Sequence, residues 1–175
     1  HDKMASAVLV TDDMALAQAV QSEIERQLPA LPRADIARAS IDNQGKIIVT
    51  PALLRALDVA NQLAPEHLEL CVDQPFDYLA KVRNAGSIFL GRSCPEALGD
   101  YLAGPNHTLP TSGTARFSSP LSVDDFVKKS QFTYYTAAAL EAVQGKIAAF
   151  ARQEGLEAHA RSAEIRFETE GGDER

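Results

Sequence analysis

Hydrophobic positions in the first hundred residues alternate between short apolar runs and segments with helical period. The run ASAVLV at 5–10 is small and β-branched, as in a strand buried on both faces. Large apolar residues then recur every four positions, which predicts one amphipathic helix that ends at the prolines after it. These positions are Leu16, Val20, Ile24 and Leu28. Such alternation is typical of βα units and predicts an α/β fold with mostly parallel strands.

The same pattern continues to about residue 102. We expect strands at 46–50, 67–72 and 87–90. We expect one helix that begins at Pro51 and two further helices at about 76–84 and 95–102. Side-chain oxygens precede two of the helices, so Thr11 and Asp12 are expected to cap the first and Thr50 the second. Together these elements predict an incomplete Rossmann-like, mostly parallel sheet with flanking helices.

The pattern changes after residue 102. Prolines, glycines and hydroxyl residues fill 103–122, and a loop of this length in a compact domain is usually functional or disordered. A helical pattern returns over 134–152, breaks at Gly155, and resumes near Leu156. We therefore expect an α/β domain at 1–117 and a C-terminal helical arm at 118–175. Two short helices bury little surface alone, so the arm is expected to dock on the first domain or on a partner chain.

Net charge, hydrophobicity and cysteine content limit the possible partners and the cellular compartment. Lys and Arg number 17 against 24 Asp and Glu, a net charge of −7 that disfavours nucleic acid and anionic membranes as partners. No apolar run approaches the roughly 20 residues of a membrane span, so we expect a soluble protein. The two cysteines, Cys71 and Cys94, fit a reducing, cytoplasmic compartment and are expected to be small buried residues.

Histidine and carboxylate residues are the candidates for chemistry. Glu66 and His67 stand at the entry to the third predicted strand, where alternation sends neighbouring side chains to opposite faces unless the backbone bends. They are either an acid–base pair or a capping Glu beside a partly buried His.

Two further pairs lie in the second half of the chain. Asp100 and His107 follow the fourth strand, near the sheet edge where ligands of open α/β folds bind, and both residue types are zinc donors. Glu154 and His159 flank Gly155 and either converge across that break or form a solvated helix face. The chain contains no GxGxxG or GxxxxGK[ST] motif, so it has no recognisable pyrophosphate loop.

Several stretches resemble the histidinol dehydrogenase family. They are LAPEHLEL at 63–70, AGSIFLGRSCPEALGDYLAGPNHTLPTSGTARFSSPLSVDDF at 85–126, and EAHARSAEIRF at 157–167. The opening HDKMASAVLVT resembles the segment that begins on the His of the family's Gln-x-x-His metal motif. The resemblance leads us to expect the C-terminal portion of a longer enzyme.

The resemblance implies a role for each matching residue. His67 matches the general base of the oxidation steps, and Glu66 matches the residue that activates water. His1, Asp100 and His159 match zinc ligands. The implied substrate-binding residues are His67, Asp100, His107, Glu154 and His159.

The implied reaction is the oxidation of L-histidinol through histidinal to L-histidine, with zinc positioning the substrate and two NAD as acceptors. The resemblance also implies that NAD binds mainly to a domain outside this chain. A homodimer is implied as well, in which the C-terminal arm completes the neighbour's active site. Two alternatives stay open: a related zinc and NAD alcohol dehydrogenase for another hydroxylated substrate, and an inactive dimerising fragment.

Overall fold

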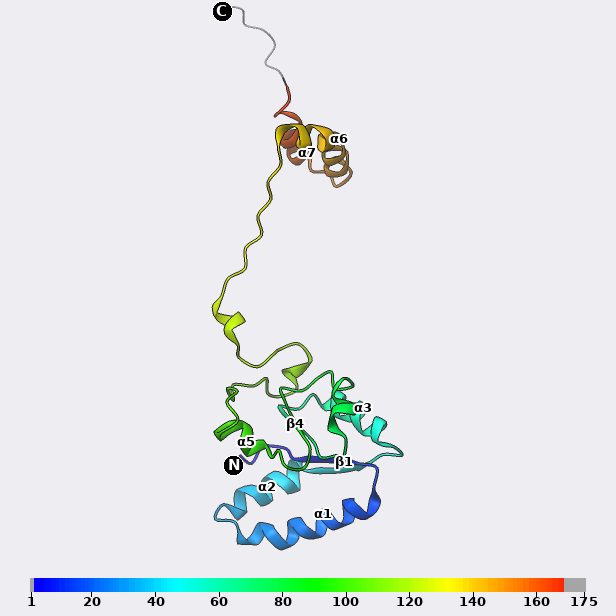
Figure 1. Cartoon of the computed structure of the whole chain (residues 1–175), viewed down its shortest axis with the longest axis vertical. Coiled ribbons are helices and arrows are strands. Elements are labelled where there is room, and N and C mark those ends of the chain that lie inside the picture. Colours follow the sequence, from blue (N-terminus) through cyan, green and yellow to red (C-terminus); the bar gives the residue numbers. More distant parts are fainter. Residues whose placement is uncertain (1, 169–175) are drawn as a thin grey trace, which may run out of the picture. The chain divides into compact units, whose positions relative to one another are not determined.

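The computed structural model describes residues 2–168 and divides the chain into two compact units, one ending at Val127 and one beginning at Lys128 (Figure 1). The first unit contains β1 (Val8–Thr11), α1 (Met14–Gln27), η1 (Leu28–Ala30), α2 (Ala34–Gln44), β2 (Lys46–Val49), α3 (Leu53–Leu63), β3 (His67–Leu70), α4 (Pro75–Leu79), β4 (Ser87–Leu90), α5 (Glu96–Tyr101), η2 (Thr114–Arg116) and η3 (Val123–Phe126). The second contains α6 (Ala137–Gln153) and α7 (Glu157–Glu164). Among the described residues, no helix is long and apolar enough to cross a membrane.

The strands pair in parallel, which confirms the predicted α/β class. β1 pairs with β2, with Val8 opposite Lys46, and β3 pairs with β4, with His67 opposite Ser87. Within residues 2–168 these pairs form two separate two-stranded sheets rather than the single sheet that we expected. The local pattern identifies strands but not their neighbours, since pairing depends on cross-strand and packing contacts.

The helix starts differ from two of the predicted caps. The N-cap of α1 is Asp13, whose carboxylate accepts hydrogen bonds from the first turn, while the Thr11 hydroxyl accepts one from the Asp13 backbone N–H at 3.1 Å. The prediction that Thr50 caps α3 is wrong, because the N-cap is Ala52. The Thr50 hydroxyl instead donates to the Ala52 carbonyl oxygen at 3.1 Å, which uses it in the turn before the helix.

Helix α2 has no counterpart in our sequence prediction. Its two large apolar residues, Ile36 and Ile41, are five positions apart rather than three or four, so they do not repeat at the helical spacing that the prediction relies on. The helix ends at Gly45, whose backbone N–H bonds to the Ile41 carbonyl at 3.0 Å. A Cβ at Gly45 would lie 2.6 Å from that carbonyl oxygen, so the tight entry to β2 requires glycine.

The cysteines are less buried than predicted. Cys71 is exposed just after β3, and Cys94 is half-buried before α5. Partial burial and the negative charge of Glu69 raise the pKa of the Cys71 thiol. The expectation of two buried cysteines is therefore wrong, because both residues lie beyond strand ends rather than within the sheet.

A close approach between α5 and β4 depends on Gly99. A Cβ at this position would lie 2.6 Å from the ring of Phe89, which is 5% exposed and packed in the core. We predict that Gly99→Ala lowers the free energy of unfolding by about 1–3 kcal/mol through overpacking. Urea denaturation of the chain, followed by far-UV circular dichroism, measures this loss.

The matched control is Gly145→Ala in α6, where an added Cβ meets nothing within 4 Å. This change is expected to stabilise the chain by up to about 1 kcal/mol, because alanine is the better helix former. Equal stability of Gly99→Ala and the parent chain would contradict the predicted contact.

The second unit is a helical hairpin, as the sequence predicted. Gly155 ends α6 with a φ of +75°, a conformation that favours glycine. The hairpin buries four alanines, Ala148, Ala151, Ala160 and Ala163. Arg152 ties the helices together through ion pairs to Glu157 at 3.0 Å and Glu164 at 2.8 Å.

Candidate active site

His67 is placed by the turn between α3 and β3. Ala64 ends α3 in the left-handed conformation, with a φ of 51°, and is fully buried. The chain then enters β3 at His67, and the imidazole lies 6.0 Å from the Phe89 ring, measured between centroids. With 28% of its side chain exposed, His67 is held by packing yet accessible to a ligand.

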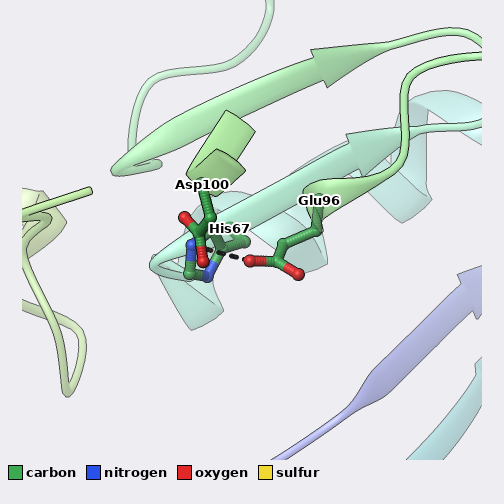
Figure 2. A group of neighbouring side chains, drawn as sticks. All are labelled: His67, Glu96 and Asp100. Carbon is green, nitrogen blue, oxygen red and sulfur yellow. Dashed lines mark ion pairs between the residues drawn. The ribbon is translucent and has the colours of Figure 1, made fainter. Parts of the chain in front are cut away.

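Two carboxylates from α5 converge on this imidazole (Figure 2). Glu96 and Asp100 are four residues apart and therefore lie on one face of the helix. One donor atom from each carboxylate and one from His67 lie within 4.8 Å of one another. Glu96 Oε1 lies 3.6 Å from His67 Nε2.

The surroundings of Glu96 shift its protonation. The pKa of Glu96 is raised, first by burial, and then by the hydrogen bond to Asp100 and the negative charges of Asp100 and Glu69. The charge of His67 acts in the opposite direction. The site therefore concentrates negative charge around one imidazole, an arrangement suited to a proton or a divalent cation.

Glu66 does not belong to this group. Its side chain is half-buried, and its backbone carbonyl accepts a hydrogen bond from the Ser87 N–H at 2.8 Å. Its catalytic role, like that of His67, stays a prediction from the family resemblance.

His107 lies in the long loop, which is held in a defined shape. The Asn106 side chain accepts from the Thr108 N–H at 2.8 Å and donates to the Leu121 carbonyl, so it joins the two sides of the loop. Arg116 donates to the Gln62 carbonyl at the end of α3. His107, the residue after Asn106, is exposed. Its contact with substrate stays a prediction.

The remaining predicted residues lie elsewhere. Glu154 is the C-cap of α6 and His159 lies on α7, both exposed in the second unit. His1 lies outside the described residues. The meeting of Asp100 with His159 and His1 at one zinc ion therefore stays a prediction.

Glu96 is the site residue that our sequence reasoning missed. It lies one turn before Asp100 in PEALGD, and two carboxylates at this spacing normally repel each other. That spacing was the available signal, but it points to a site only when His67, 29 positions earlier in the sequence, is known to face the same helix.

The donor set suits zinc. Imidazole nitrogen and carboxylate oxygen are both common zinc ligands, and Asp100 is exposed at the edge of the group. The fold and the site thus define an α/β protein with a histidine and carboxylate centre beside a parallel strand pair.

Comparison with known proteins identifies the family. The family model described as histidinol dehydrogenase matches residues 1–167, so the chain belongs to the histidinol dehydrogenase family. It is 59% identical over 170 residues to a histidinol dehydrogenase of Bacillus cereus and 56% identical over 171 residues to one of Geobacter metallireducens. These matches cover 97% and 98% of this chain but 40% and 39% of the relatives.

A solved structure gives the same result. The crystal structure of histidinol dehydrogenase from Elizabethkingia anophelis is similar with a TM-score of 0.86 at 36% identity. The match covers 95% of this chain and 38% of that one. The chain therefore spans about two-fifths of the length of the relatives that it matches.

Proposed function

We propose that this chain is the C-terminal catalytic portion of an NAD-dependent histidinol dehydrogenase of histidine biosynthesis. The observation that carries the proposal is the convergence of His67 with Glu96 and Asp100 inside the segment that matches the family. A base beside carboxylates fits the removal of a hydroxyl proton, which alcohol oxidation requires. The proposed location is the cytoplasm.

The proposed reaction consists of two oxidations with one hydration between them. In the first, the hydroxyl proton of L-histidinol passes to His67 and a hydride passes to NAD, which gives histidinal. Water activated by Glu66 then adds to the aldehyde. A second proton and hydride leave the hydrate, which gives L-histidine and a second NADH. NAD is bound mainly by residues outside this chain.

Zinc and substrate are assigned to residues of both units. His1, Asp100 and His159 would hold zinc, which orients the amino alcohol when it is bound. His67, Asp100, His107, Glu154 and His159 would contact the substrate, and the Glu154 carboxylate suits its ammonium group. The exposure of Asp100, Glu154 and His159 supports these roles, because a ligand can reach all three.

A homodimer would bring these residues together. The arm would complete the site of the neighbouring subunit, since the hairpin buries mainly alanines and leaves larger apolar side chains uncovered. Ile147 is 40% exposed and Phe150 is 67% exposed in this chain. Such side chains are typical of a surface that packs on another one.

The test uses the full-length enzyme that contains this chain, incubated with NAD and L-histidinol. We expect two NADH for each histidinol consumed, with L-histidine as the product. Alaninol, an amino alcohol without the imidazole, is expected to give no NADH. The 175-residue chain alone is also expected to give none, because NAD binding is assigned elsewhere. No NADH from the full-length enzyme, or preferential oxidation of alaninol, would overturn the proposed function.

A further inference from the structure

One nitrogen of the proposed base is buried and unpaired. Among the described residues, His67 Nε2 is the buried side-chain polar atom that has no hydrogen-bond partner. An unpaired buried polar atom is unfavourable, so a partner for Nε2 is expected within the site. The closest ion-pairing group to Nε2 is the Glu96 carboxylate, at 3.6 Å.

A hydrogen bond to β3 holds Glu96 in place. Its backbone N–H donates to Glu69 Oε1 at 2.8 Å, which joins the start of α5 to β3, the strand that begins with His67. With its backbone anchored in this way, Glu96 keeps a carboxylate oxygen directed at the ring (Figure 2).

The pairing of Glu96 with Asp100 is unfavourable for helix α5 itself. Like charges four residues apart destabilise a helix, and α5 is only six residues long. Helix stability therefore does not explain the Glu96 and Asp100 pair. Contact with His67 does explain it, because an imidazole that carries a proton is attracted to both carboxylates.

We propose that Glu96 is the positioning residue of His67: it accepts the Nε2–H hydrogen bond and leaves Nδ1 as the nitrogen that takes the substrate proton. This inference rests on the proposed function, in which His67 is the base. A carboxylate that holds one ring nitrogen fixes both the tautomer and the orientation of the other. The present 3.6 Å is longer than a hydrogen bond, and such contacts commonly shorten when substrate binds.

Glu96 also assists each proton transfer. When the substrate hydroxyl proton reaches Nδ1 and its hydride leaves for NAD, His67 becomes an imidazolium with both nitrogens protonated. The Glu96 oxygen beside Nε2 stabilises that positive charge without taking the proton. The stabilisation is absent before the transfer, so its loss lowers kcat more than it raises KM.

The test compares Glu96→Ala and Glu96→Gln in the full-length enzyme. Alanine removes the acceptor and is expected to lower kcat about 10- to 100-fold, the loss typical when a group that orients a site histidine is removed. Glutamine keeps an acceptor oxygen but not the negative charge, so it is expected to hold the tautomer yet to recover only part of kcat. Asp73→Asn is the control, since it removes a carboxylate whose ion pair with Arg92 is largely exposed, and it is expected to leave kcat unchanged.

A readout independent of activity separates positioning from folding. In enzyme labelled with 15N in the histidine rings, the His67 signal, assigned by its loss in His67→Asn, is expected to show the Nε2–H tautomer. Glu96→Ala is expected to lose that preference and Glu96→Gln to retain it. Zinc content is expected to be unchanged in Glu96→Ala and reduced in Asp100→Ala, a proposed ligand.

Each opposite result overturns the inference. An Nδ1–H tautomer in the parent enzyme, or the same tautomer in parent and Glu96→Ala, removes the positioning role of Glu96. Loss of zinc in Glu96→Ala would make its effect one of metal binding instead. The NMR result does not depend on which alcohol is oxidised, so it is distinct from failure of the proposed function.

Discussion

The His67→Asn variant of the full-length enzyme is expected to oxidise histidinol about 10²- to 10⁴-fold more slowly than the parent enzyme. Asparagine has a polar side chain of similar reach but no nitrogen that accepts a proton at neutral pH. The ring contact with Phe89 is lost, but His67 is only half-buried, so the fold should be retained. Steady-state NADH formation at saturating histidinol and NAD measures the loss in kcat.

Zinc content and folding are the controls for this variant. His67 is not among the proposed zinc ligands, so His67→Asn is expected to keep the parent zinc content and far-UV circular dichroism spectrum. A variant that matches the parent in both and also in turnover would remove His67 from the role of base. A variant that loses zinc would instead indicate that His67 acts through the metal.

The elements that could be predicted from sequence are those with a strong local pattern. The strand β4 was predicted with its observed bounds, 87–90, and the hairpin break at Gly155 follows from the freedom of glycine at positive φ. Helix α2 was not predicted, because its two large apolar residues, Ile36 and Ile41, lie five positions apart and do not repeat at helical spacing. The start of α3 was misplaced because the Thr50 hydroxyl bonds to a turn carbonyl rather than to a helix N–H.

The candidate site was predicted unevenly for a related reason. His67 and Asp100 were identified from residue type and family resemblance, and the structure brings them together. Glu96 was missed because its role arises from tertiary contact: only the pairing of β3 with β4 and the packing of α5 bring its carboxylate to His67. Arg116 in η2 bonds to the Gln62 carbonyl of α3, and the first compact unit extends to Val127; the domain boundary after residue 117 stays a prediction.

A buried asparagine supports the strand beside the site. Asn61 in α3 is 5% exposed, and its side chain makes three hydrogen bonds to the segment before β4. Its Nδ2 donates to the Lys81 carbonyl at 2.9 Å, and its Oδ1 accepts from the Arg83 and Asn84 backbone N–H groups at 2.6 and 3.2 Å. Asn61 therefore fixes the entry to the strand whose Phe89 packs near His67 and against α5.

Asn61→Ala is expected to lower the free energy of unfolding by about 3 kcal/mol, because three backbone groups lose their partner. Urea denaturation of the chain measures the loss, and hydrogen exchange should show faster exchange of the Arg83 and Asn84 amides in particular. The matched control is Asn43→Ala, which removes one hydrogen bond from an exposed helix position and should change stability by less than about 0.5 kcal/mol. Equal losses in the two variants would contradict the supporting role of Asn61, since burial and bond number are what distinguish them.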